Sequence, residues 1–302
     1  DLASSIIHNS LFLKYYDEIR PEASEDEFRE KIESALELLA GNQADNGGYG
    51  WFDYDAVNYE LSAYVGIALG RAADVGITPE GGRVDNLRLY LWNGMGSDEI
   101  NIDEEVLGAY ALAVLGDRSV LPKLLHLKNS GGSFSKSPLD IAHLMLALQS
   151  LGSQGDAAEL IAPLENLAVT TQRTATWQDG DTDFRVLQSV EYATAVVYQA
   201  LSAYDNVEIA DKAQTWLVEN PVHMRGGTAE ATAIFYSLTS SNISNLEGRK
   251  GVNNVAISVN GQEVQNFNVG GDDDWTGKVS VSVPTGILRD GTNVIEVERE
   301  GD

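Results

Sequence analysis

Apolar residues between positions 2 and 240 recur at the spacing of α-helices. Residues 24–41 give the clearest example, because one face of the predicted helix is apolar and the opposite face is charged. Ser24 and Glu27 have the spacing of a capping box, and Gly41 follows the last apolar position. The segment therefore predicts a one-sided surface helix. Its apolar stripe comprises Phe28, Ile32, Ala35, Leu36 and Leu39.

The predicted helices alternate in character along the chain. One kind is apolar nearly all round and carries recurring Ala and Gly, which is typical of helices buried on most sides. The other kind is apolar on one side only. The first kind is predicted at residues 59–71, 104–115, 139–151, 189–204 and 228–239, and the second at residues 84–91, 120–128, 157–167 and 209–218. This alternation predicts two concentric layers of helices.

A glycine-rich turn recurs before helices of the first kind. Its clearest copy is Gly47-Gly48-Tyr49-Gly50-Trp51-Phe52, and looser copies lie at residues 94–96, 131–134, 175–177 and 226–228. The copies are roughly 37 to 49 residues apart, the length of a helix pair that cannot bury its apolar face alone. We therefore predict a mainly α protein built on an (α/α)6 toroid of concentric helix hairpins, with about eleven helices discernible.

Near residue 240 the pattern changes to period two. Residues 240–245 are polar and are predicted as an unstructured link. Residues 255–259 alternate, and Asn260-Gly261 is a strong hairpin signal because both central positions of a type I′ turn need positive φ. Further strands are predicted at residues 263–269, 278–283 and 293–298.

These patterns predict two domains, an α/α toroid over residues 1–245 and a small all-β region over residues 246–302 that forms part of a sandwich. Asp1 does not resemble a natural start, so we expect the sequence to be a segment of a longer protein.

Charge and cysteine content exclude several classes of function. The chain carries 46 acidic and 20 basic residues, a formal net charge of -26. Such a surface repels phosphate backbones and anionic lipid, so neither nucleic-acid binding nor membrane insertion is expected. The chain has no cysteine, which excludes disulfides, thiolate metal ligands and a cysteine nucleophile.

Candidate metal and cofactor sites are weak. His143 falls within an apolar helix, where a core position is expected rather than a ligand. Residues 179–183 (Asp-Gly-Asp-Thr-Asp) imitate the start of a calcium loop, but Phe184 and Val190 stand where that loop needs Gly and Glu. We predict no metal and no cofactor, and interpret residues 272–274 (three Asp) as a solvated loop.

One cluster of aromatic and acidic residues is a candidate surface site or barrel mouth. It comprises Tyr49, Trp51, Phe52, Asp53, Tyr54 and Asp55. Such a set can bind a sugar or hold catalytic carboxylates at the mouth of a helix barrel. The same rings can instead plug the end of the barrel, and we favour plugging because aromatic residues recur in the copies at Phe134 and Trp177. We predict no catalytic residue.

Several stretches resemble the α2-macroglobulin and complement family in its bacterial form. The stretch at residues 47–52 is similar to that family's Gly-Gly-aromatic-Gly-Trp sequence, and residues 61–65 and 191–195 resemble its Thr-Ala-Tyr helix starts. Residues 226–232 resemble the opening of its final helix. In the β region, Asn260-Gly261 and residues 288–295 are similar to strands that follow the helical domain in bacterial members.

The resemblance implies a thioester-domain-like toroid followed by part of a CUB-like β domain, into which the helical domain is inserted. Thioester-bearing members join a Cys thiol to a Gln carbonyl within Cys-x-x-Gln, and the resemblance puts that motif at about residues 1–5 (Asp-Leu-Ala-Ser-Ser). Neither residue type is present there. Either the motif is lost, as in the thioester-lacking members of the family, or the given sequence begins just after it. Without a thiol no thioester forms, so in both cases we expect no acyl transfer from this chain.

Two classes of function follow. The resemblance implies a non-catalytic segment that takes part in protease entrapment or another protein interaction. It also implies an extracytoplasmic location, which is periplasmic, secreted or at the cell envelope. A purely structural scaffold, without a partner, is the limiting case. The alternative is a glycan-active (α/α)6 barrel enzyme, hydrolase or lyase, that uses carboxylates at the barrel mouth. The positions of Asp53, Asp55, Glu60 and Glu191 distinguish the two, because hydrolysis needs two carboxyl groups about 5–10 Å apart.

Overall fold

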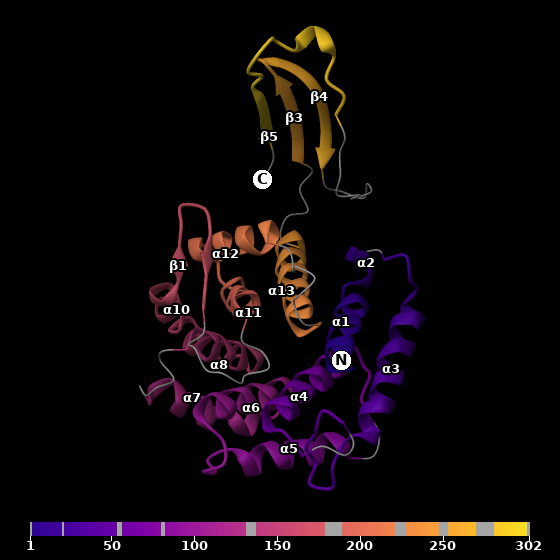
Figure 1. Ribbon diagram of the computed structural model, residues 1–302, viewed down its shortest axis with the longest axis vertical. Helices are drawn as coiled ribbons and strands as arrows, with labels where there is room; N and C mark the ends of the chain where they lie inside the picture. The colour runs from indigo at the N-terminus through magenta and orange to yellow at the C-terminus, as the bar shows by residue number, and fades with distance from the viewer. Residues whose placement is uncertain are drawn as a thin grey trace. The chain divides into compact units, whose positions relative to one another are not determined.

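The computed structural model describes residues 2–19, 21–52, 56–79, 82–130, 137–178, 189–220, 228–247, 253–269 and 281–300. Contacts divide the chain into two units, Asp1–Ser241 and Asn242–Asp302. The protein is mainly helical and carries a small antiparallel sheet (Figure 1). The helices and strands of each unit largely follow the helical and period-two patterns of the sequence.

The helical unit contains a first set of helices that follow one another in contact. α1 contacts α4, α4 contacts α6, α6 contacts α8, and α8 contacts α11. As predicted, α4, α6, α8 and α11 are buried on nearly every side. The same prediction for residues 228–239 is wrong, because most of these residues in α13 are partly exposed, as are several in α1. The set comprises α1 (Leu2–Lys14), α4 (Tyr59–Asp74), α6 (Ile102–Val114), α8 (Pro138–Ser150), α11 (Val190–Leu201) and α13 (Thr228–Glu247).

A second set of helices covers the first. α3 packs on α1, α5 on α4 and α6, α7 on α6 and α8, α9 and α10 on α8, and α12 on α11. α3 buries the predicted stripe from Phe28 to Leu39, and the Ser24 hydroxyl accepts the Glu27 N–H at its start (3.3 Å). The set comprises α3 (Glu25–Gly41), α5 (Arg83–Gly94), α7 (Leu121–Asn129), α9 (Gln154–Ala158), α10 (Ile161–Leu167) and α12 (Glu208–Glu219); α2 (Tyr16–Ile19) and the 3-10 turn Arg118–Val120 connect helices.

Small residues bring α4 and α6 into close backbone contact. A Cβ atom added to Gly70 would lie 2.6 Å from Val114 Cγ1 and 2.7 Å from the Val114 carbonyl oxygen. One turn earlier, a Cβ on Gly66 would lie 3.2 Å from that of Ala111. The recurring Gly and Ala of the sequence therefore set the helix separation here.

The last helix of the first set contacts both α11 and α1. The Phe235 ring of α13 lies 4.9 Å from the His8 ring and 5.2 Å from the Phe12 ring of α1. Beyond the end of α11, the Ser202 hydroxyl lies 2.6 Å from the Ser241 hydroxyl of α13. These contacts are those a closed ring requires, although the complete toroid remains a prediction.

The prediction of an unstructured link at residues 240–245 is wrong, because α13 runs to Glu247. The serine hydroxyls form hydrogen bonds within the helix: Ser237 donates to the Ile234 carbonyl (3.0 Å) and Ser240 to the Tyr236 carbonyl (2.7 Å). Ser237 and Ser241 are also buried. The polar composition of this segment therefore does not indicate a link, because its serine hydroxyls form hydrogen bonds to carbonyls of the preceding helical turn.

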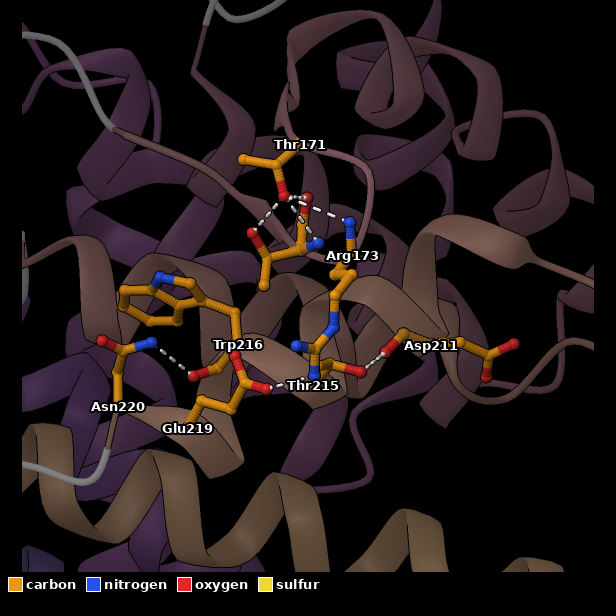
Figure 2. A network of polar contacts seen from close by, with 8 residues as sticks. Thr171, Arg173, Asp211, Thr215, Trp216, Glu219 and Asn220 are labelled. Carbon is orange, nitrogen blue, oxygen red and sulfur yellow. Dashed lines mark hydrogen bonds and ion pairs between the residues drawn. The ribbon is translucent and has the colours of Figure 1, made fainter. Parts of the chain in front are cut away.

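A short hairpin that the sequence analysis missed lies between α10 and α11. β1 (Val169–Thr170) pairs antiparallel with β2 (Ala175–Thr176), and the Thr171 hydroxyl accepts backbone N–H groups from Arg173 and Thr174 in the turn. Figure 2 shows the Arg173 guanidinium reaching Glu219 of α12, at 2.6 Å. The Arg173 side chain is mostly exposed, so this ion pair orients the hairpin more than it stabilises the fold.

The second unit is a three-stranded antiparallel sheet in the order β4-β3-β5. The hairpin predicted at Asn260-Gly261 is confirmed, with φ values of 56° and 81°. The strand predicted at residues 278–283 is wrong for residues 281–283, which form no strand. Residues 278–280 lie outside the described part of the chain. Pro284 lacks an N–H and leads into the 3-10 turn Thr285–Ile287. The strands are β3 (Asn253–Val259), β4 (Gln262–Val269) and β5 (Ile295–Glu300).

Candidate functional site

The described rings of the candidate cluster at residues 49–55 lie in different environments. Tyr49 is buried, and its backbone bridges to Gln43 and Asn58. Its N–H donates to the Ser62 hydroxyl of α4 (2.8 Å), and burial raises the pKa of the Tyr49 phenol to about 12. Tyr49 therefore has a structural role, fixing the turn to the start of the next helix.

The remaining residues of the cluster differ from Tyr49. Trp51 is 50% exposed and Phe52 is 58% exposed. Asp53, Tyr54 and Asp55 lie outside the described residues, so the proposed carboxylate mouth remains a prediction. The exposed rings of Trp51 and Phe52 present an aromatic surface rather than a plug.

Trp177, in a later copy of the turn, repeats the arrangement of Tyr49. Its side chain is fully buried, its backbone N–H donates to the Thr194 hydroxyl of α11 (3.2 Å), and its indole N–H donates to the Leu164 carbonyl (2.8 Å). In both copies, an aromatic residue of the turn donates its N–H to a hydroxyl in the first turns of the following helix. Phe134, the third copy, lies outside the described residues.

A small, half-open cavity lies among the first set of helices and was not predicted from the sequence. Its volume is about 50 Å³, and each of α1, α4, α6, α8, α11 and α13 contributes to its wall. Half of the polar side chains in its wall belong to tyrosines. The polar set comprises Tyr64, Tyr110, Tyr192, Tyr236, Arg71, His143, Gln199 and Thr232.

Arg71 is the centre of the polar contacts in this cavity. Its Nη2 donates to the Tyr110 hydroxyl (3.1 Å), its guanidinium lies over the Tyr236 ring at 5.0 Å, and its Nη1 lies 3.5 Å from the Asp74 carboxylate. Burial by itself lowers the pKa of Arg71, but Tyr236, Tyr110 and Asp74 outweigh that effect and raise it. The cavity therefore holds a permanent positive charge.

His143 occupies the core position that the sequence predicts. It is 3% exposed, its ring stacks on that of Tyr110 with centroids 5.4 Å apart, and burial lowers its pKa to about 3. The imidazole is therefore neutral near pH 7. A nearly buried, uncharged histidine cannot supply a second cation to the cavity.

Tyr192 and Tyr64 keep their protons at neutral pH. Burial raises the pKa of Tyr192 well above its usual value, and the nearby Tyr64, Tyr110, Glu60 and Glu230 raise it further. Burial also raises the pKa of Tyr64 to about 12. Both hydroxyls therefore act as hydrogen-bonding groups and not as bases.

The start of α1 is where the resemblance would put a thioester motif. Ser4 is buried there, and its hydroxyl lies 3.0 Å from the Tyr64 hydroxyl. This pair is a neutral hydrogen bond between α1 and α4. It contains no group that forms an acyl thioester, in keeping with the absence of cysteine from the sequence.

The other candidates add no site. Among the described residues, no three His, Asp or Glu side chains come together as a metal would require. Residues 179–183 and 272–274 lie outside those residues. The described helices include none with the length and apolar character needed to cross a bilayer. Glu60 and Glu191, the described carboxylates of the enzyme alternative, lie in the first turns of α4 and α11.

Comparison with known proteins finds relatives only at the level of structure. No protein-family model matches the sequence, and no curated protein matches it significantly. The native α2-macroglobulin of Escherichia coli matches with a TM-score of 0.63 and 19% identity, and the Salmonella protein reacted with methylamine matches with a TM-score of 0.64 and 18% identity. Each match covers 88% of this chain and 17% of the relative.

A crystal structure of the E. coli protein that spans domain MG7 to the C-terminus matches over 88% of this chain and 42% of its own length, with a TM-score of 0.62 and 19% identity. The chain thus spans about a sixth of the full-length relatives. At this identity the likeness concerns the fold. This chain has the fold of a C-terminal part of the bacterial α2-macroglobulins.

Proposed function

We propose that this chain is a non-catalytic, thioester-free segment of an α2-macroglobulin-like protein that takes part in protease entrapment or another protein interaction. The observation that carries the proposal is the match over 88% of the chain to bacterial α2-macroglobulins, combined with a sequence that has no cysteine. Solved structures of the E. coli relative include forms activated by elastase and by trypsin. Proteases are accordingly the partners to test first.

We further propose that residues 1–245 form a closed α/α toroid. The order of contacts from α1 to α11, and the seating of Phe235 against His8 and Phe12, support closure between the first and last helices of the first set. A cavity walled by all of these helices is also what a ring leaves at its axis.

The second proposed domain, residues 246–302, consists of trailing strands of a CUB-like sandwich. Its sheet supports this assignment through the register, which pairs Ile257 with Val297 and Val259 with Ile295 and so makes one face apolar. Ile295 and Val297 are 67% and 64% exposed. We propose that strands from elsewhere in the longer protein cover this face, and that the protein is extracytoplasmic.

Amine labelling tests the chemistry directly. The chain and the Salmonella α2-macroglobulin, which reacts with methylamine, are incubated with a labelled methylamine and their masses are measured. We expect covalent uptake by the Salmonella protein and none by this chain. Stoichiometric uptake by this chain would refute the thioester-free proposal.

Protease capture tests the role. We expect the full-length parent protein to retain trypsin or elastase after limited cleavage, as measured by co-sedimentation at high salt. A parent protein that is cleaved and releases the protease unhindered contradicts entrapment and leaves another protein interaction or a structural role.

The glycan-active alternative would use carboxylates at the barrel mouth. Asp53 and Asp55 lie outside the described residues, and neither Glu60 nor Glu191 lines the cavity around Arg71. Release of reducing ends from a panel of polysaccharides, abolished by Asp53→Asn or Asp55→Asn, would support this alternative.

A further inference from the structure

The cavity within the helical unit has an unusual charge for this protein. The chain as a whole carries a net charge of -26. Among the described residues, however, the one side chain with a formal charge that lines the cavity is Arg71. His143 beside it is neutral, and burial raises the pKa values of Tyr64, Tyr110 and Tyr192. Arg71, whose charge is partly balanced by Asp74 at 3.5 Å, is therefore the ionised group that a molecule entering the cavity meets.

The contacts of Arg71 leave it able to bind a further acceptor. A guanidinium has five N–H donors in a planar fork. The Tyr110 hydroxyl accepts one of them, and Nη1 forms an ion pair at 3.5 Å with Asp74, a carboxylate that is 44% exposed and does not line the cavity. The Tyr110 hydroxyl accepts from Arg71 and so keeps its own proton for donation to a ligand.

The rest of the wall limits the ligand to a small, partly apolar molecule. Ile67, Leu146 and Val196 line the cavity beside the polar groups. The volume of about 50 Å³ is several times the roughly 10–15 Å³ that one water needs on this measure, and well below that of a benzene site. It has room for a few non-hydrogen atoms.

The charge and shape favour a carboxylate over other anions. Arg binds planar carboxylates through two parallel hydrogen bonds. Asp74 already balances part of the Arg71 charge, so a dianionic phosphate would leave more charge uncompensated than a monocarboxylate, and uncompensated buried charge is costly to desolvate. The methyl or short alkyl end of a monocarboxylate meets the apolar wall.

We propose that this cavity binds a small monocarboxylate, with Arg71 and Tyr110 as the groups that hold its oxygens. The carboxylate has two possible sources, a free short-chain acid such as acetate or the carboxylate of a peptide terminus. This inference goes beyond the proposed function and does not depend on protease binding.

The test measures thermal unfolding of the full 302-residue chain at pH 7 in 100 mM sodium acetate and in sodium chloride of equal ionic strength. A ligand of this size binds at about 1–10 mM. We expect acetate to raise Tm by about 3–8 °C relative to chloride. The larger benzoate ion, which exceeds the cavity, should have no such effect.

Two variants make the test specific. Arg71→Gln should abolish the acetate effect, whereas Arg173→Gln, which removes an exposed guanidinium on the β1–β2 hairpin, should retain it. If Arg71→Gln does not fold, as judged by circular dichroism, Tyr110→Phe replaces it and should reduce the acetate affinity several-fold. Saturation-transfer NMR of acetate with the unaltered chain provides a measurement without any substitution.

A short peptide ending in a free carboxylate, and the same peptide with an amidated end, distinguish the sources. If acetate raises Tm, a free acid is sufficient for binding. If only the free-ended peptide raises Tm, the ligand is a peptide terminus. The proposal is overturned if neither ligand shifts Tm or gives an NMR signal, or if Arg71→Gln responds to acetate as fully as the unaltered chain does.

Discussion

The helical unit and the sheet unit differ in how completely they bury their apolar residues. In the helical unit, α4, α6, α8 and α11 bury residues on nearly every side because neighbouring helices cover them. In the sheet unit, Val259 is buried, but Ile295 and Val297 on the same face are about two thirds exposed. The first unit completes its core from residues within the chain, whereas the described residues of the second leave part of its apolar face exposed.

The difference follows from how each architecture buries apolar surface. A helix hairpin needs only the next hairpin along the chain, so a run of them builds its own core. A sheet needs a second layer against its apolar face, and three strands alone provide none. The helical unit should therefore tolerate isolation, whereas the sheet unit should depend on a partner.

The largest effect is expected where the helical core is most completely filled. Trp177→Ala should destabilise the chain by about 3–5 kcal/mol, because it empties a fully buried site and leaves the Leu164 carbonyl without its indole donor. Urea unfolding followed by circular dichroism measures the loss. Trp51→Ala is the matched control: its side chain is 50% exposed, so the change should stay within about 0.5 kcal/mol. Equal losses in the two variants would contradict the assignment of Trp177 to the core.

Acid should weaken the helical core through His143. Its pKa is about 3 in the folded chain and 6.5 in the unfolded chain, so the unfolded chain binds the proton first. The stability is fully present above pH 6.5 and is lost as pH falls toward 3, at about 1.4 kcal/mol per pH unit, or about 2.7 kcal/mol at pH 4.5. In His143→Gln the dependence of unfolding free energy on pH should be shallower by this amount. An unchanged slope would mean that His143 is protonated in the folded chain.

The close approach of α4 and α6 gives the next effect. Gly70→Ala should cost about 1–3 kcal/mol, because the new methyl group meets the Val114 backbone. Gly155→Ala in α9 should be neutral or stabilise by up to about 1 kcal/mol, since no atom lies within 4 Å of its Cβ position. Urea midpoints of the two variants compare a tight and an open glycine directly, and a reversed order would contradict the packing described here.

The smallest effect on stability is expected in the sheet unit. Val297→Thr should change the unfolding free energy by less than about 0.5 kcal/mol, because the side chain is 64% exposed. It should nevertheless weaken self-association, since an uncovered apolar sheet face invites pairing between copies. Sedimentation velocity at increasing concentration measures the association. An identical concentration dependence with and without the substitution would indicate that this face is already covered.

The sequence predicts the helices well because their signals are local. The stripe from Phe28 to Leu39 and the Asn260-Gly261 turn are each specified within a few residues, and the structure confirms both. The helix predicted at residues 228–239 ends too early, because a run of Ser and Asn gives no local sign that its hydroxyls will form hydrogen bonds within the helix. The β1–β2 hairpin was missed because its strands are only two residues long, although Val169 and the surrounding Thr residues favour strand.

The candidate sites were harder to predict than the fold. The aromatic cluster was identified from one contiguous stretch, and the structure separates the buried Tyr49 from the exposed Trp51. The cavity around Arg71 draws residues from six distant helices, and no spacing along the chain brings Arg71, Tyr110 and Tyr236 together. The one available signal was a lone Arg in an otherwise apolar helix of the buried kind.

The most direct test of the account asks whether α13 closes against α1. The chain has no cysteine, so His8→Cys combined with Phe235→Cys provides the sole pair of thiols. With a short thiol-specific crosslinker, we predict rapid crosslinking within one chain, as for the control pair Ser202→Cys and Ser241→Cys, whose parent hydroxyls lie 2.6 Å apart. Crosslinking in the control pair but none between positions 8 and 235, in a chain with unchanged circular dichroism, would contradict a closed toroid.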